Sequence, residues 1–222
     1  MKRQHRLILC LTGAWLLLSP FLSAQDKPSA TSFLSARIGP ALYTGHLMGI
    51  THRSGNYCNR LRRGVSWNLN YWYTGKTSRK ENVILRPGFL YQGSRFQATR
   101  QNSSDNIHLN YLAPQLGIFF LQNKYRLLLS AGAGYQFYTD KSTVYEKPRT
   151  VSMDRLACNL ALDGECLLSS RWGLSARCGW LFSHSENYSV NYHGTDWKVE
   201  HPDSGEGYFG QLSLTFGLNY HF

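Results

Sequence analysis

The sequence lacks an apolar run of the roughly 20 residues that a membrane-spanning helix requires. Its clear apolar stretch, residues 7–18, is shorter and follows the basic residues 1–6. Small and polar residues then lead to Ala24, a pattern typical of a secretory signal peptide cleaved after that residue. We therefore expect residues 1–24 to be a signal peptide and residues 25–222 to form the single domain of an exported protein.

Acidic residues are also few. The chain has 13 Asp and Glu against 24 Lys and Arg, and the signal peptide removes three of the basic residues and no acidic one, which leaves a formal charge of +8. Export separates the protein from nucleic acid, so we expect no nucleic-acid partner. Lipid phosphates are the more plausible counter-charge.

Cysteine spacing gives no sign of a metal site. Apart from Cys10 in the signal peptide, the cysteines are Cys58, Cys158, Cys166 and Cys178, with no Cys-x-x-Cys pair. An exported chain can form disulfides, but the last three fall on the apolar face of the strands inferred below. We expect them to act as small hydrophobic side chains. Histidine spacing and glycine-rich loops likewise suggest no cofactor.

What the sequence does contain is alternation. From Tyr208 to the C-terminus, apolar residues occupy every second position, which predicts a strand with two unlike faces. A helix would spread both sets around its circumference. The segment exceeds the roughly 9–11 tilted residues that cross a bilayer. Its apolar row is Tyr208, Gly210, Leu212, Leu214, Phe216, Leu218, Tyr220 and Phe222.

Seven further segments show the same alternation, which makes eight strands. They are residues 34–44, 65–73, 83–96, 109–121, 125–138, 156–168 and 172–183. The connections alternate between short (75–81, 122–124, 169–171) and long (46–63, 98–106, 139–154, 184–207). This predicts an all-β fold: an eight-stranded antiparallel up-and-down transmembrane β-barrel with short periplasmic turns and four longer extracellular loops.

Alternation alone is also compatible with a soluble barrel that turns its apolar face inward around a ligand. Two features favour the membrane: the polar face is rich in Gly, Ser, Asn and Gln, and aromatic residues such as Tyr125, Trp172 and Phe137 stand at the ends of apolar rows. An open sheet edge is prohibitively costly in hydrocarbon, so the first strand should pair with the last. We expect a protein of the outer membrane whose lumen is filled by side chains.

Two segments carry a family resemblance. Residues 108–118 (HLNYLAPQLGI) and the Gly-rich residues 127–135 (LLLSAGAGY) resemble the porin-like outer membrane protein β-barrel domains common in Bacteroidetes, a resemblance that implies fold and location but no activity. The terminal strand is similar to the signal recognised by the barrel assembly machinery of Gram-negative bacteria, which implies that machinery as a partner. The signal residues would be Phe216, Leu218, Tyr220 and Phe222.

Five charged residues fall on inward-facing positions: Arg37, Arg86, Asp163, Glu165 and Arg177. Asp163 and Arg177 are about equally far from the turn at 169–171, which predicts that they are neighbours on adjacent strands. A gate or ion path is one interpretation of these charges. We favour a salt-bridge network, because buried charges must be paired.

The first long loop is basic, with Arg53, Arg60, Arg62 and Arg63. Guanidinium groups bind phosphate through two parallel hydrogen bonds. The loop is therefore a candidate for contact with lipopolysaccharide phosphates, and a solvated hydrophilic loop is the alternative.

Some eight-stranded barrels modify lipid A with a His and a Ser near the outer rim, where this chain has Ser183, His184, Ser185 and Glu186. Neighbouring residues on a strand point to opposite faces, so His184 and Ser185 cannot simply serve one another. We therefore expect no enzyme, but a monomeric barrel of structural or interaction type. A lipid A-modifying enzyme and a narrow solute channel are the alternatives.

Overall fold

The computed structural model describes residues 32–47, 49–73, 75, 83–122, 124–184, 187–200 and 207–222. The expected signal peptide lies outside these residues. The elements are β1 (Ser32–Tyr43), α2 (Gly55–Leu61), β2 (Arg63–Tyr73), β3 (Val83–Arg100), β4 (Ser103–Gln122), β5 (Tyr125–Val144), β6 (Lys147–Leu167), β7 (Trp172–His184), β8 (Asn187–Tyr192), β9 (Thr195–Glu200) and β10 (Tyr208–His221).

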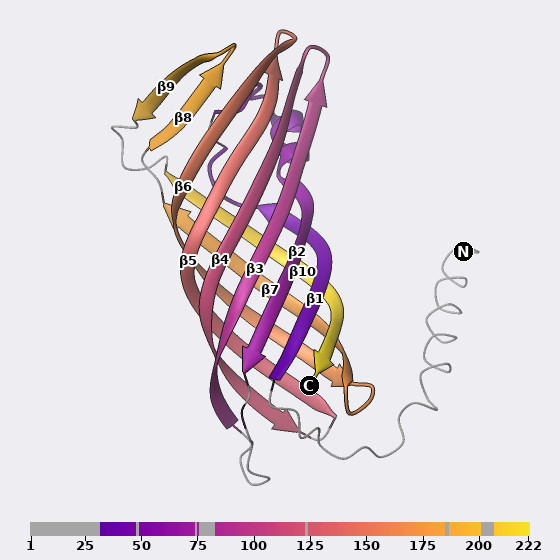
Figure 1. Cartoon of the computed structure of the whole chain (residues 1–222). Coiled ribbons are helices and arrows are strands. Elements are labelled where there is room, and N and C mark those ends of the chain that lie inside the picture. The colour runs from indigo at the N-terminus through magenta and orange to yellow at the C-terminus, as the bar shows by residue number, and fades with distance from the viewer. Residues whose placement is uncertain are drawn as a thin grey trace, which may run out of the picture.

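Eight of the strands form a closed antiparallel ring (Figure 1). Each strand from β1 to β6 pairs with the next, β7 pairs with β10, and β10 pairs with β1. At the seam the amide of Phe222 donates to the Ser32 carbonyl over 3.0 Å, and the amide of Ser32 donates back over 3.2 Å. The predicted all-β ring of eight strands, with the first strand paired to the last, is confirmed.

The two faces of the ring differ as the alternation predicts. Large apolar side chains such as Ile38, Leu116 and Phe216 are exposed on the outside, whereas Asn68 and Thr215 are buried inside. The described cysteines are free, and Cys158 and Cys178 lie on the outer face. None of the described helices is long and apolar enough to cross a membrane.

Two of the four predicted long loops are wrong. Where residues 98–106 and 139–154 were expected to be loops, the strands continue into tight turns at Gln101–Asn102 and Tyr145–Glu146. Of the other two, residues 46–63 contain α2, and residues 184–207 contain the β8–β9 hairpin, which pairs with β6 over Arg149–Ser152.

These errors arise because the alternation of outward apolar and inward polar side chains is reversed at one end of the barrel. We call the end of the barrel with the chain terminus the Phe222 end, and the other the hairpin end. Toward the hairpin end, apolar side chains turn inward and polar ones outward, so no apolar outer row marks the strands there. The buried cluster at this end includes Tyr43, Phe96, Ile107, Tyr138, Val151 and Phe209.

The seam gives a test of closure. A Cβ at Gly217 on β10 would lie 1.9 Å from the Ala36 carbonyl oxygen of β1, whereas one at Gly164 on the outer face of β6 would meet no atom within 4 Å. Gly217→Val should therefore lower the free energy of unfolding in urea by about 2 kcal/mol through overpacking. Gly164→Ala is the matched control and should change it little. Equal unfolding midpoints for the two variants would contradict this seam.

Candidate functional site

The Phe222 half of the interior holds a buried ion cluster centred on Asp163 of β6. Its carboxylate lies 2.8 Å from Arg177 on β7 and 3.1 Å from Arg37 on β1, and all three side chains are almost fully buried. Asp163 and Arg177 are direct cross-strand partners, as their distances from the turn suggested. Arg37 reaches them from β1, which only β10 separates from β7, and it also donates to Ser175 over 2.7 Å.

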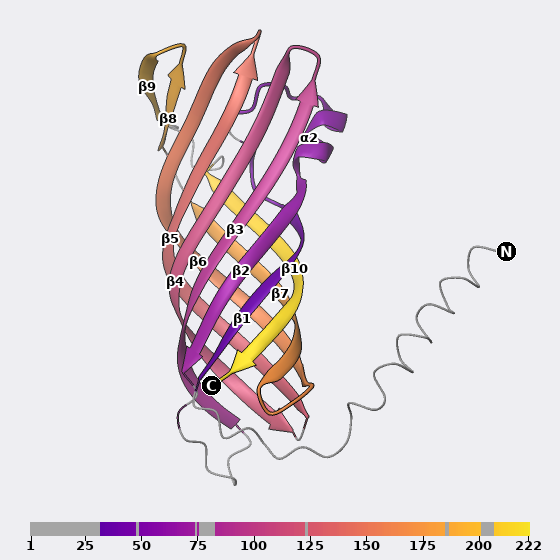
Figure 2. The same ribbon diagram turned by 45° about the vertical axis from the view of Figure 1, so that its right-hand side comes forward.

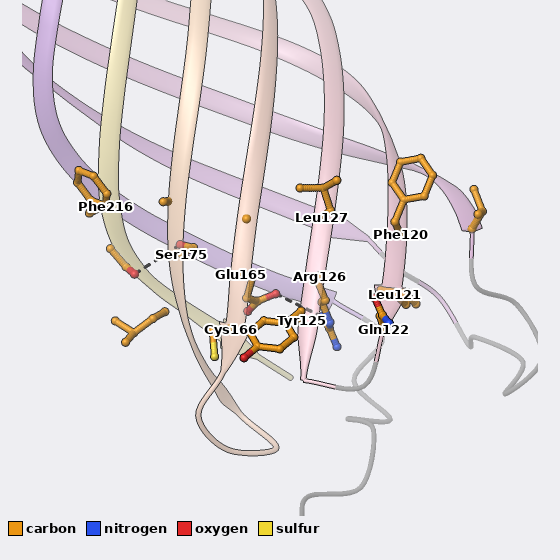
Figure 3. Close-up of a pocket in the computed structure, with 15 residues that line it drawn as sticks. Phe120, Leu121, Gln122, Tyr125, Arg126, Leu127, Glu165, Cys166, Ser175 and Phe216 are labelled. Atoms are coloured by element: carbon orange, nitrogen blue, oxygen red, sulfur yellow. Dashed lines mark hydrogen bonds and ion pairs between the residues drawn. The ribbon is translucent and has the colours of Figure 1, made fainter. Parts of the chain in front are cut away.

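A second ion cluster surrounds Glu165, two residues further along β6. Its carboxylate lies 2.6 Å from Nε2 of His221 on β10 and 3.8 Å from Arg126 on β5. Figure 3 shows Glu165 and Arg126 facing one another where they line a cavity at the Phe222 end. His221 and Arg126 were not among the predicted site residues, although their inward positions in the alternation were the available signal.

Arg86 is the predicted charge that the structure does not bring into this network. It lies half-buried on the inner face of β3, and no ion pair joins it to another described residue. The remaining groups connect β1, β5, β6, β7 and β10 across the interior. Because a buried charge that loses its partner is strongly destabilising, the clusters hold the strands in one arrangement.

A third cluster lies at the hairpin end, where sequence reasoning placed loops. Asp105 on β4 and Asp140 on β5 are fully buried, and Arg149 of β6 lies 3.5 Å from the first and 3.7 Å from the second. Thr51 donates its amide to Asp105 over 3.0 Å, and the Tyr57 hydroxyl lies 2.9 Å from the same carboxylate. The segment between β1 and β2 is thus fastened to the barrel through buried carboxylates.

Burial and the neighbouring Asp105 carboxylate raise the pKa of Asp140 to about 7, with Arg149 opposing the shift. Both carboxylates lie beyond the outward apolar rows, in the part of the barrel where the pattern is inverted. At neutral pH a proton on Asp140 therefore relieves repulsion within the cluster.

The four predicted loop arginines occupy different places. Arg60 on α2 donates to the Thr99 carbonyl of β3 over 2.6 Å, and Arg62 donates to the Tyr43 carbonyl over 3.4 Å. Arg63 is exposed on the outer face of β2, and Arg53 is exposed just before α2. They do not form one compact cluster.

Arg63 instead belongs to a larger basic outer surface that sequence reasoning missed. It consists of Arg63, Arg95, His108 and Lys141, which lie on the outer faces of β2, β3, β4 and β5 beyond the apolar rows. Arg95 is the cross-strand partner of His108. Partial burial and the charges of Arg95 and Lys141 lower the pKa of His108. The carboxylates on these strands, Asp105 and Asp140, both point inward.

The predicted rim residues of the lipid A-modifying alternative lie on opposite faces. Ser183 is buried inside and donates to Gln136 over 2.7 Å, while His184 is exposed outside. Ser185 and Glu186 lie outside the described residues. Among the described residues, no group of three or more His, Cys, Asp or Glu side chains is placed to hold a metal ion.

No protein-family model and no curated protein matches this sequence. Solved structures do match. The chain aligns with a major outer membrane protein from Thermus thermophilus at a TM-score of 0.54 and 15% identity, over 86% of this chain and 99% of that one. Neisserial surface protein A matches at 0.51 and 10% identity (87% and 98% covered), and OprG from Pseudomonas aeruginosa at 0.51 and 10% identity (89% and 99% covered).

The chain has the fold of an outer-membrane β-barrel. The low identities show the fold alone and transfer no role to its residues. In such a barrel the outward apolar rows face hydrocarbon and the inverted hairpin end stands in water. The basic outer surface then lies just beyond the hydrocarbon boundary, and the Asp163 and Glu165 clusters lie within the spanning part.

Replacing the Asp163 carboxylate with an amide should strongly lower the stability of the barrel. Asp163→Asn leaves Arg37 and Arg177 buried without a carboxylate, so the free energy of unfolding should fall by about 3 kcal/mol. Urea titration of the folded barrel measures it, with Asp154→Asn on the exposed face of β6 as control. If both variants unfold at the wild-type midpoint, the cluster does not stabilise the barrel.

The hairpin-end cluster predicts a pH dependence. The pKa of Asp140 in the folded protein lies above its ordinary value, so between the two values the folded state binds more protons than the unfolded state. The stabilisation is therefore complete below the ordinary pKa of the carboxyl group, falls progressively as pH rises, and is lost above about pH 7. Between pH 6 and pH 8 the loss should be on the order of 1 kcal/mol. Amide hydrogen exchange of β4 and β5 at pH 6 and pH 8 measures this.

Asp140→Asn should remove that difference and protect β4 and β5 at pH 8. Exchange that is as strongly pH-dependent in the variant, after correction for intrinsic rates, would show that Asp140 is not the titrating group.

Proposed function

We propose that this chain is an outer-membrane barrel of structural and interaction type, whose basic outer surface binds the phosphates of lipopolysaccharide. The observation that carries the proposal is the position of Arg63, Arg95, His108 and Lys141. They face outward just beyond the apolar rows, on four consecutive strands whose carboxylates all point inward. Phosphates of a surrounding leaflet lie at that depth.

The chemistry of these side chains suits phosphate. The guanidinium groups of Arg63 and Arg95 donate forked hydrogen bonds, and Lys141 adds a point charge. Arg95 Nε is 2.9 Å from Asn106 Oδ1, which fixes the direction of its guanidinium group. Of the arginines predicted in the first long loop, Arg53, Arg60 and Arg62 lie in the segment between β1 and β2, from which they can extend the contact toward sugar phosphates above the bilayer.

The interior supports a closed barrel and not a solute channel. Its Phe222 half is crossed by the Asp163 and Glu165 clusters, and its hairpin half is filled by the apolar cluster around Phe96 and Phe209. Tyr57 of α2 belongs to that apolar cluster, which supports a mouth that is narrowed by the segment after β1. In this proposal, the purified protein gives no discrete conductance steps in planar bilayers.

The proposed orientation places the hairpin end outside the cell and both chain ends in the periplasm. Phe216, Leu218, Tyr220 and Phe222 are exposed on the outer face of β10, where the barrel assembly machinery would read them before closure. The porin-like family of Bacteroidetes remains our proposal for ancestry. It is supported by the motifs at 108–118 and 127–135, which form the paired strands β4 and β5.

The phosphate contact is tested by Arg63→Gln combined with Arg95→Gln. Loss of two charge-assisted contacts should weaken lipopolysaccharide binding about tenfold, or ~1.4 kcal/mol, at physiological salt. The wild-type affinity should also fall steeply as salt is raised. Binding is measured by titrating folded protein with lipopolysaccharide micelles.

Arg171→Gln is the matched control. It removes one positive charge at the Phe222 end, as each of the two substitutions does at the basic outer surface, and it should leave binding unchanged. Unchanged affinity of the double variant, or an equal loss in the control, would overturn the proposed contact.

A further inference from the structure

The hairpin end carries a sheet that extends beyond the ring and has two lateral edges (Figure 1). It runs in the order β3, β4, β5, β6, β8, β9. The β3 edge is covered by α2, where Arg60 donates to the Thr99 carbonyl and Tyr57 lies 3.1 Å from the Ala98 carbonyl. On the β9 edge no described residue pairs with the strand. Uncovered edges are templates for pairing with another chain.

The pairing of β9 with β8 determines which backbone N–H and C=O groups of β9 face the open edge. The two strands are joined by a two-residue turn in which His193 and Gly194 both have positive φ, and Tyr192 is opposite Thr195. In such a hairpin Thr195, Trp197 and Val199 direct their N–H and C=O groups toward β8. The intervening residues, Asp196, Lys198 and Glu200, therefore direct theirs to the open edge.

The side chains of β9 make this edge complementary to itself. Antiparallel pairing of two β9 strands centred on Trp197 sets Asp196 of each copy opposite Lys198 of the other, and Trp197 opposite Trp197. Both charge pairs then fall on residues whose backbone groups face the partner strand. A shift by two residues in either direction sets Lys198 opposite Lys198, or Asp196 opposite Asp196. Opposite charges and aromatic pairs favour the centred register, and like charges disfavour the shifted ones.

We propose that β9 binds β9 of a second copy of this chain in that centred register. The residues are available: Asp196, Trp197 and Lys198 are all exposed, and Val199 packs against the apolar cluster and holds the strand on the barrel. The interface is isologous, because one patch serves both partners.

The symmetry of this pair decides where the second copy lies. Antiparallel strands in one sheet are related by a two-fold axis perpendicular to the sheet. Figures 1 and 2 both show β8 rising along the barrel axis, so that two-fold axis runs across the barrel axis and inverts the partner barrel. All barrels in one membrane point the same way. Given the outward orientation of the hairpin end in the proposed function, β9 therefore joins copies in two facing membranes.

A single pair of six-residue strands is a weak contact, but many copies on each surface multiply it. The suitable readout is therefore clustering of vesicles that carry the protein in a lipopolysaccharide-free bilayer. Digestion by added protease identifies preparations in which the hairpin end faces outward, and light scattering measures vesicle clustering.

The charge pattern allows a rescue experiment. Asp196→Lys places Lys opposite Lys, and Lys198→Asp places Asp opposite Asp, so vesicles of either variant alone should cluster at least about fivefold less than wild type. Vesicles of one variant mixed with vesicles of the other regain both opposite-charge pairs and should cluster to within about twofold of wild type. Lys147→Asp, at the exposed turn between β5 and β6, controls for net charge and should retain clustering.

Dispersed wild-type vesicles would overturn the proposal, as would clustering of either variant alone at the wild-type level. A mixture that stays dispersed would equally overturn the centred register. Failure here is distinguishable from failure of the phosphate contact. The variant with Arg63→Gln and Arg95→Gln should still cluster in this bilayer, and the β9 variants should bind lipopolysaccharide as wild type does.

Discussion

Closure of the backbone hydrogen-bond ladder between β1 and β10 is the constraint on which the rest of this structure depends. Hydrocarbon offers no partner for a free N–H or C=O, so a spanning sheet must have no open edge. The ladder from Phe33–His221 to Tyr43–Gln211, completed by the hydrogen bonds between Ser32, the first residue of β1, and Phe222, meets that requirement. Once the ring is closed, eight strands leave an interior narrow enough for side chains to fill.

The side chains that fill the interior differ between the two ends of the barrel, because one end is surrounded by lipid and the other by water. Within the bilayer the outside must be apolar, so polar and charged side chains turn inward and have to be paired, as Asp163 and Glu165 are. Beyond the bilayer the outside meets water, and the same strands turn apolar side chains inward around Phe96 and Phe209. Edges are again permitted there, and the β9 edge and the basic outer surface both occur in this part of the molecule.

Period-two alternation predicted the ring, its closure and the inward position of the charges, because one face of every spanning strand is fixed by lipid. It identified the Asp163–Arg177 neighbours, since a tight turn fixes register. It could not predict that Arg37 on β1 reaches Asp163 on β6 past β10 and β7, which depends on how the sheet curls. It also failed at residues 98–106 and 139–154, where the outer row becomes polar and the turn Tyr145–Glu146 lacks the usual glycine or asparagine. The basic outer surface was missed because its four residues are far apart in the sequence. One of them, Lys141, also lies in the segment 139–154, which was predicted to be a loop.

The most direct measurement of the closed membrane barrel is electrophoretic migration of the folded chain with and without boiling. A closed ladder resists detergent until it is heated, so the unboiled protein should run as a compact species and shift to the position of the unfolded chain after boiling. Identical migration of boiled and unboiled samples, taken from a preparation that is folded by circular dichroism, would contradict a closed barrel.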